Sequence, residues 1–167
     1  QNDYLHHEKF IFLFAEDFTN TFLKYGTYEL MARNSPVFYI FLSLFVKAGI
    51  EIQIINFANA VIIPIYLLVF ISCLKIKYKF IDLSIQILFA SIILLSPTIR
   101  SLVVWPYPFI WGLLFFLISV YFFLKFKEEN DESLKFKNSL YNIFFLALSS
   151  YITPNFSVFA IYFFHHI

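Results

Sequence analysis

IQIINFANAVIIPIYLLVFISCL, residues 52–74, is the stretch that decides the fold, because its twenty-three residues include no charged side chain. LVVWPYPFIWGLLFFLISVYFFL, residues 102–124, is equally long and equally uncharged. About twenty apolar residues, with a helical rise of about 1.5 Å each, match a hydrocarbon core about 30 Å thick. Each stretch is therefore predicted to be a helix that spans a membrane.

Two further stretches are nearly as apolar. Residues 80–95 carry only Asp82, which we expect to pair with Lys79, and residues 140–164 carry no charged side chain. The sequence thus predicts an all-α integral membrane fold whose transmembrane part covers residues 52–167. Its four predicted spans are residues 52–74, 80–95, 102–124 and 140–164. A break is expected in the middle of the last span, at Thr153-Pro154-Asn155, because proline cannot donate a helical hydrogen bond.

The composition also supports a membrane protein. Hydrophobic residues make up 60% of the chain, and a soluble domain of this composition would lack polar surface. The net charge of +1 gives no basis for nucleic-acid binding. The single cysteine, Cys73, excludes an internal disulfide and a cysteine-based metal cluster. The chain starts at Gln1 without a methionine and stops after an apolar run, so we interpret it as a piece of a longer protein.

The loops indicate an orientation, since lysine and arginine collect on the cytoplasmic side of a membrane. Residues 75–79 hold three lysines and no acid, and residues 125–138 hold four lysines. Two spans separate these loops, so both are predicted to be cytoplasmic. Residues 96–101, residues 1–51 and the end of the last span are then predicted to lie outside. We expect a multi-pass protein of the plasma (inner) membrane.

Residues 1–51 form the predicted extracytoplasmic segment, which carries six acids and two short apolar pieces. In the first piece, residues 10–23, four phenylalanines recur every fourth residue: Phe10, Phe14, Phe18 and Phe22. This spacing places them on one face of a helix, and the polar remainder favours a helix lying on the membrane surface.

The second apolar piece, residues 36–46, follows Ser35, and Pro36 is typical of the first helical position. It is short for a span and is predicted to be an interfacial or re-entrant helix. The alternative is a tilted fifth span, which would move residues 1–34 to the cytoplasm. The predicted fold is thus four transmembrane helices plus two interfacial helices in the outer segment.

The order of these features follows a recognisable pattern. The acidic outer segment leads to Asn34-Ser35-Pro36-Val37-Phe38-Tyr39 and an apolar run ending in Lys47-Ala48-Gly49. One span then ends in basic residues, and the next ends in Ser96-Pro97-Thr98-Ile99-Arg100. This layout resembles the N-terminal half of polytopic glycosyltransferases of the GT-C superfamily, which includes the protein-mannosyltransferase-like and aminoarabinose-transferase-like enzymes. The family motif has two prolines where this chain has one.

The resemblance implies an enzyme that transfers a sugar from a polyprenyl-phosphate carrier to an acceptor at the outer face of the membrane. In such enzymes an acid soon after the first helix acts as a base or metal ligand. Asp3 and Glu8 stand at about the corresponding distance before Pro36. Asp17, in the only adjacent acidic pair of the segment, is the candidate second carboxylate. The family pair is usually Asp-Glu, which this chain lacks here, so the choice of base stays open.

Sugar transfer also needs a cation for the departing lipid phosphate and a groove for the lipid. Arg100 is the candidate cation. Tyr39 is a candidate substrate-binding residue, as is Trp105 in an aromatic cluster with Tyr107 and Trp111. A divalent metal ion is a candidate cofactor without an assigned ligand set. Both histidine pairs lie outside in the predicted topology and are a second candidate for a metal site: His6, His7, His165 and His166.

A non-enzymatic polytopic membrane protein is the alternative, such as a transporter, a flippase or a polymerase component for lipid-linked glycans. Transporters place polar or charged groups at the middle of the membrane. Here the span centres carry only Asn56, Asn59, Gln86 and the break at Thr153-Pro154-Asn155. Polar residues gather instead in the outer segment, which favours chemistry at the membrane surface over translocation.

Overall fold

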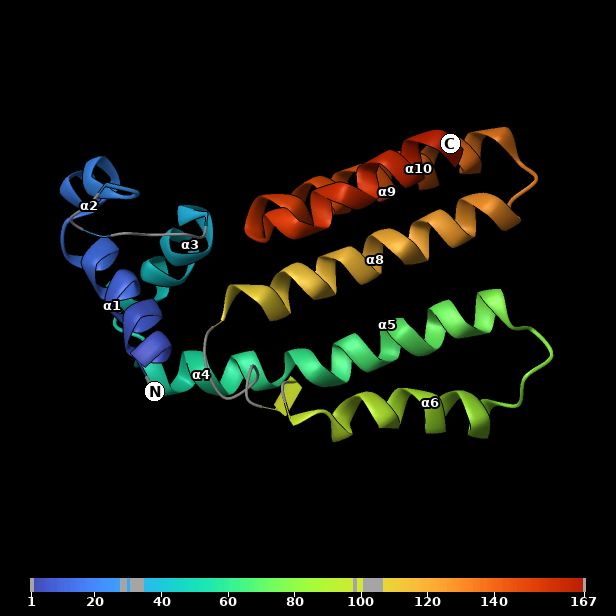
Figure 1. The fold of residues 1–167 in the computed structure, drawn as a ribbon, viewed down its shortest axis with the longest axis horizontal. Helices are drawn as coiled ribbons and strands as arrows, with labels where there is room; N and C mark the ends of the chain where they lie inside the picture. Colours follow the sequence, from blue (N-terminus) through green and yellow to red (C-terminus); the bar gives the residue numbers. More distant parts are fainter. Residues whose placement is uncertain (1, 28–29, 31–34, 98, 101–106, 167) are drawn as a thin grey trace.

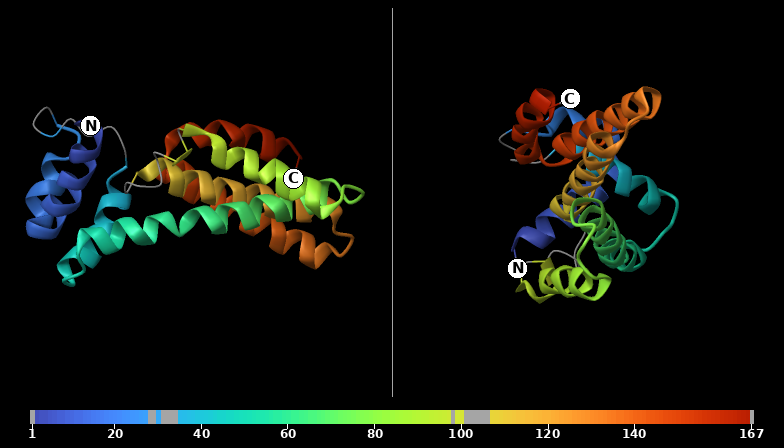
Figure 2. Two further views of the ribbon diagram at one scale, coloured as in Figure 1. Left: turned by 90° about the horizontal axis from the view of Figure 1, so that it is seen from below. Right: turned by 90° about the vertical axis from the view of Figure 1, so that its right-hand side faces the viewer.

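The computed structural model describes residues 2–27, 30, 35–97, 99–100 and 107–166, with the backbone alone for residues 2–5. Every regular element in this part of the chain is a helix, which confirms the all-α class (Figure 1). Three short N-terminal helices, α1 to α3, gather at one end of a bundle of longer helices. The left view of Figure 2 shows the same separation from below.

The N-terminal segment starts with α1 (Asn2–Glu16) and α2 (Phe18–Lys24), and the chain breaks between them at Asp17. The Asp17 carboxylate accepts a hydrogen bond of 3.0 Å from the backbone N–H of Asn20, so Asp17 is the N-cap of α2. The predicted single helix over residues 10–23 is therefore wrong, because an N-cap residue has a non-helical backbone that ends one helix and starts another.

The phenylalanines expected on one face are divided between two environments. Phe10 and Phe14 are each 2% exposed, whereas Phe18 and Phe22 are 49% and 51% exposed. The break at Asp17 explains the difference, because the face of α1 does not continue into α2. The prediction that all four phenylalanines face the membrane surface is therefore wrong for the first two, which lie in a protein core.

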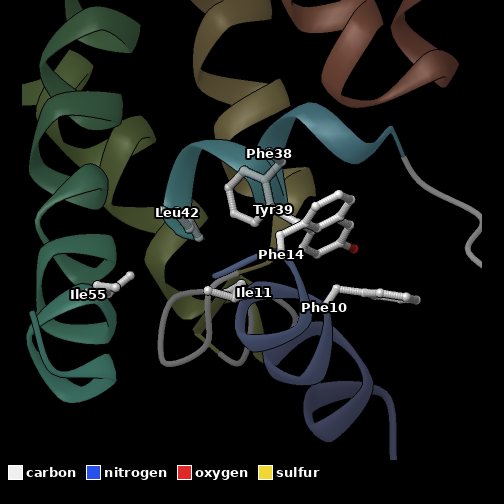
Figure 3. Close-up of a cluster of buried hydrophobic side chains, with 7 residues drawn as sticks. All are labelled: Phe10, Ile11, Phe14, Phe38, Tyr39, Leu42 and Ile55. Atoms are coloured by element: carbon white, nitrogen blue, oxygen red, sulfur yellow. The ribbon is translucent and has the colours of Figure 1, made fainter. Parts of the chain in front are cut away.

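The helix α3 (Pro36–Lys47) confirms the helix predicted over residues 36–46. It starts after Ser35, whose hydroxyl accepts a 3.4 Å hydrogen bond from the backbone N–H of Val37. Its inner face packs against α1 in a cluster of buried side chains (Figure 3). That cluster consists of Phe10, Ile11, Phe14, Phe38, Tyr39, Leu42 and Ile55.

Two helical regions among the described residues are long and apolar enough to cross a membrane. The first combines α4 (Ile52–Ala60) and α5 (Ile62–Lys77), which follow each other with a break at Val61. The second is α8 (Pro108–Glu128). The predicted span at residues 80–95 forms only the 13-residue helix α6 (Leu83–Leu95), which is shorter than a full crossing requires.

The last apolar stretch forms three pieces, namely α9 (Glu132–Ile152), the 3₁₀ helix η1 (Pro154–Val158) and α10 (Phe159–His166). The predicted break at Thr153-Pro154 is therefore present. The chain also reverses there, because Phe159 and Phe163 of α10 pack in sequence order on Phe116 and Phe123 of α8. This order makes α10 parallel to α8 and antiparallel to α9, so residues 140–164 are a helical hairpin and not one span.

The hairpin changes the place of the C-terminal histidines. The Lys127 ammonium group, near the end of α8, donates a 3.0 Å hydrogen bond to the carbonyl oxygen of His166. His165 and His166 therefore lie at the lysine-rich end of the bundle, which we define as the end that holds residues 75–82 and 125–138. The prediction that they lie on the other side, with residues 1–51, is wrong.

The two lysine-rich loops lie at the same end of the bundle, as the sequence predicts. Lys79 forms a salt bridge with Glu128 at the end of α8, which joins the two loops directly. This partner replaces the expected one, Asp82, which instead precedes the first residue of α6. The helices α1 to α3 lie at the opposite end, which we call the N-terminal end (Figure 1).

Polar side chains join α8 to α9 inside the bundle. The Asn142 amide group donates hydrogen bonds of 2.9 and 2.8 Å to the backbone carbonyl and the hydroxyl of Ser119. Ser149 lies seven residues after Asn142 on α9, and Gly112 lies seven residues before Ser119 on α8. The Ser149 hydroxyl donates a 2.7 Å hydrogen bond to the Gly112 carbonyl. All four residues are buried, so an antiparallel pair of polar contacts fixes the register of the two helices.

Candidate functional site at the N-terminal end

His7 and Tyr39 form the centre of the N-terminal end. His7 on α1 is 7% exposed and Tyr39 on α3 is 1% exposed. The Tyr39 hydroxyl and His7 Nδ1 are hydrogen-bonded at 2.5 Å, and the two rings stack with centroids 5.7 Å apart. Tyr107, just before α8, meets the His7 ring edge-on at 4.7 Å. Three separate parts of the chain therefore converge on one buried imidazole.

Tyr39 was predicted to bind substrate, and its burial gives it a different position. Because its ring lies inside the α1–α3 cluster, it orients α1 on α3 and offers no open surface to a ligand (Figure 3). Sequence analysis did not find His7 as its partner. The sequence did contain part of the evidence for a buried position of His7, because His7 stands three residues before Phe10 and so lies on the same helical face as the buried phenylalanines.

Of the three candidate carboxylates, Glu8 is the one whose side chain the structure places at this end. It follows His7 on α1 and is partly buried. Asp3 lies on the first turn of the same helix, and its side chain is outside the described residues. Both acids belong to the half of α1 that carries His7, so the backbone brings the two predicted bases into one region.

Asp17 lies apart from these two acids. Asp17 is nine positions after Glu8 and just beyond the end of α1, which corresponds to about 14 Å along the helix axis at about 1.5 Å per residue. Its carboxylate is exposed and bonded to the N-terminus of α2. The structure therefore gives Asp17 a helix-capping position, and it does not bring Asp17 together with Glu8.

Arg100 follows α6, which runs from the lysine-rich end to the N-terminal end, so Arg100 lies at the end that holds α1. Its backbone N–H donates a 3.1 Å bond to the Ser96 carbonyl, and its side chain is exposed. The described residues provide no salt bridge to its guanidinium group. An exposed arginine at this end, with no ion-pair partner among the described residues, is compatible with the predicted role of a phosphate-binding cation.

Trp105 lies outside the described residues. The neighbouring Trp111, on the first turn of α8, takes part in the cluster instead. Its indole N–H donates a 2.8 Å hydrogen bond to Asn59 Oδ1 on α4, and its ring lies near Phe38 and Phe41 of α3. Trp111 thus ties the N-terminal helices to both α4 and α8.

Burial raises the pKa of one neighbouring tyrosine. Tyr25 follows α2 and packs against Phe10, Phe14 and Tyr39. Loss of water around its hydroxyl, with a smaller contribution from Tyr39, raises the pKa of Tyr25 well above the ordinary tyrosine value of 10.0. The Tyr25 hydroxyl is therefore neutral at physiological pH and remains a hydrogen-bonding group.

A metal centre is not formed by the described residues. No group of three or more histidine, cysteine, aspartate or glutamate side chains comes together in this part of the chain. The two histidine pairs proposed to converge are at opposite ends of the bundle, because His7 lies at the N-terminal end and His166 at the lysine-rich end. The candidate site built from both pairs is therefore wrong.

No protein-family model matches the chain, and no curated protein or solved structure matches it either. The class of protein therefore follows from the fold alone. In the described residues it is an all-helical protein with two helical regions able to cross a membrane and an aromatic, partly acidic group of short helices at one end.

Proposed function

We propose that the chain is part of a GT-C-type membrane glycosyltransferase, which transfers a sugar from a polyprenyl-phosphate donor to an acceptor at the membrane face that holds α1 to α3. One observation carries the proposal. The acid-bearing half of α1 is held at the start of α8 by the His7–Tyr39–Tyr107 group, and this end is opposite the lysine-rich loops. Tyr39 belongs to the segment whose pattern resembles the family.

The proposal places the bundle in the plasma (inner) membrane, with α4–α5 and α8 crossing it in full, α6 and α9 packed beside them in the lipid, and the lysine-rich end in the cytoplasm. Large apolar side chains on the outside of the bundle support this placement. Leu68, Leu88 and Phe89 are 65%, 62% and 52% exposed. In water such a surface is unfavourable by about 25 cal/mol for each Å², whereas lipid tails would cover it.

The short α3 supports an interfacial position over a fifth span. Its 12 residues would cover only about 18 Å of the roughly 30 Å hydrocarbon core. Its inner face also packs on α1, so it shares a core with the polar N-terminal segment. In this proposal α1, α2 and α3 form an extracytoplasmic cap on the membrane-spanning helices.

Within the proposed site each residue has one role. Asp3 or Glu8 is the base that takes the proton of the acceptor hydroxyl, and Arg100 binds the phosphate of the departing lipid. Tyr39 is a positioning residue that holds α1 through His7. Asp17 has no catalytic role here, since its carboxylate caps α2.

The test uses the full-length protein in proteoliposomes, with polyprenyl-phosphate hexoses and aminopentoses as donors and a membrane extract of the producing cell as acceptor. Liberated polyprenyl phosphate is measured. We expect Asp3→Asn or Glu8→Gln to lower its release by about 100-fold or more, the range of general-base catalysis. Glu16→Gln, an exposed carboxylate at the other end of α1, is the matched control and should keep the wild-type rate.

Wild-type rates in both the Asp3→Asn and Glu8→Gln variants would remove the proposed site. Absence of donor consumption by the wild type, with a labelled lipid-linked sugar carried across the bilayer, would establish the alternative of a transporter or flippase. The observation that favours this alternative is the set of buried amides inside the bundle. Asn59, Gln86 and Asn142 are 2%, 4% and 0% exposed, and polar groups in a membrane interior often mark a transport path.

A further inference from the structure

Two cavities lie between the same three helices at the lysine-rich half of the bundle. The first is an apolar groove of about 480 Å³, lined by residues of α5, α8 and α9. They include Leu68 and Ser72 of α5, Ile118 and Phe122 of α8, and Tyr141 and Phe145 of α9. The second is a polar cavity of about 490 Å³, whose lining includes Lys75, Lys79, Lys125, Glu128, Glu129 and Asn138.

The two cavities adjoin end to end. Along α5 the lining passes from Ser72 to Lys75, and along α8 it passes from Tyr121 to Lys125. Along α9, which runs the opposite way, it passes from Tyr141 back to Asn138. Each step is three or four residues, which is one helical turn. The two neighbouring cavities, which we together call the channel, are therefore apolar towards the middle of the bundle and polar at its lysine-rich end.

Two lysines of the polar cavity have no ion-pair partner in the part of the chain that the structure describes. Lys79 is paired with Glu128, and the Glu129 carboxylate accepts bonds from the backbone N–H groups that follow it. The described residues give Lys75 and Lys125 no salt bridge, and the Lys125 ammonium lies 5.1 Å from the centre of the Tyr121 ring. Two ammonium groups and the Asn138 amide thus face a cavity whose carboxylates already have partners.

We propose that this channel binds one anionic phospholipid of the leaflet at the lysine-rich end. Its phosphate would bind Lys75, Lys125 and Asn138, and one acyl chain would occupy the apolar groove. The charge complementarity and the one-turn step from apolar to cationic lining match the step from acyl chain to headgroup. The inference rests on the membrane placement given under Proposed function and does not depend on sugar transfer.

A polyprenyl phosphate has the same chemistry, a phosphate on a hydrocarbon chain. The position in the bundle favours a phospholipid, because the proposed donor site lies at the N-terminal end and this channel opens at the other end. A bound phospholipid would also hold α5 against α8 and α9, where the channel leaves their side chains apart. The channel is therefore a second lipid site, distinct from the proposed site of transfer.

The experiment measures lipid retained by the purified full-length protein in native mass spectra, with phosphatidylglycerol and phosphatidylcholine of equal chain length as probes. We expect the wild type to retain one phosphatidylglycerol in preference to phosphatidylcholine. Lys75→Gln and Lys125→Gln should each weaken binding about fivefold, since a lysine at an anionic headgroup contributes about one kcal/mol. Lys77→Gln, a lysine of the same helix end outside the cavity lining, is the matched control and should bind as the wild type.

A second variant tests the apolar groove. Ser72→Phe would fill the groove and should lower retention of phosphatidylglycerol while the protein elutes as the wild type in size exclusion. Equal retention of both lipids, or an equal loss in the Lys77→Gln variant, would overturn the proposal. Displacement of phosphatidylglycerol by an equal concentration of polyprenyl phosphate would also overturn it in favour of a carrier-lipid site. Because the readout is lipid mass, these outcomes are independent of whether Asp3 or Glu8 supports transfer.

Discussion

The hydroxyl of Ser149 on α9 donates a 2.7 Å hydrogen bond to the carbonyl oxygen of Gly112 on α8. One helical turn further, Thr153 lies so close to Gly112 that a Cβ at that position would be 2.4 Å from Thr153 Oγ1. The absence of a side chain at Gly112 therefore allows α9 to approach α8 at the point where the chain turns into η1. This close approach is typical of small residues at helix contacts in membranes.

Gly112→Ala should destabilise the bundle. An added Cβ would lie 2.4 and 2.9 Å from two atoms of Thr153, so the backbones must separate, and overpacking of this kind reduces stability by about 1–3 kcal/mol. Helix propensity alone favours alanine by about 1 kcal/mol, so a net loss identifies the steric contact. Thermal unfolding in detergent measures it, with Ala147→Val on the exposed side of α9 as the control. An unchanged or higher Tm for Gly112→Ala would contradict the packing.

Asn142 and Ser119 should couple energetically. A double-mutant cycle with Asn142→Ala and Ser119→Ala should give about 0.6 kcal/mol and at most about 1.7 kcal/mol, the range for interhelical hydrogen bonds in membranes. The Ser119 hydroxyl bond contributes to this coupling, whereas the bond to the Ser119 backbone carbonyl survives the serine substitution. Equilibrium unfolding of the four proteins gives the coupling, and strict additivity would exclude the side-chain bond.

Two substitutions at Asp17 distinguish a capping role from a catalytic one. Asp17→Ala should lower stability by about 1 kcal/mol, because the N–H of Asn20 loses its acceptor, whereas Asp17→Asn should retain the cap. Both variants should keep the wild-type rate in the donor assay. Unfolding and donor release are measured on the same preparations. Loss of donor release in the Asp17→Asn variant at unchanged stability would restore Asp17 as a catalytic carboxylate.

The hairpin at Thr153-Pro154 predicts a labelling pattern. In a Cys73→Ala background, cysteines at Asn130 and His165 should react with an impermeant maleimide from the same side of the membrane, since α10 returns to the end of α8. A cysteine at Lys24 should react from the other side. Labelling of His165→Cys together with Lys24→Cys would show a complete fourth crossing and contradict the hairpin.

The helical spacing of apolar residues, together with capping residues and prolines, was enough to predict several elements. Ser35-Pro36 correctly marks the start of α3, and the break at Pro154 is present because proline lacks a backbone donor. The direction of the chain after Pro154 could not be predicted this way. It depends on Phe159 and Phe163 finding Phe116 and Phe123, contacts between residues far apart in the sequence.

The candidate site shows the same limit. The acids of α1 and Arg100 were proposed from residue type, and the structure brings Glu8 and Arg100 to the same end of the bundle. The partnership of His7 with Tyr39 was missed, because a residue's type says nothing about which distant side chain it meets. The capping position of Asp17 was missed for a related reason, since a capping aspartate and a catalytic one are the same residue in a sequence.

The sequence by itself determined that this protein is helical and that its longest helices are apolar, because uncharged stretches of this length leave a membrane or a core as their only stable surroundings. It also determined that the two lysine-rich loops lie together. Only the tertiary structure decided the division of the four N-terminal phenylalanines between core and surface, the return of α10, and the pairing of His7 with Tyr39. Each of these depends on packing between distant segments, where close contact and burial outweigh local periodicity.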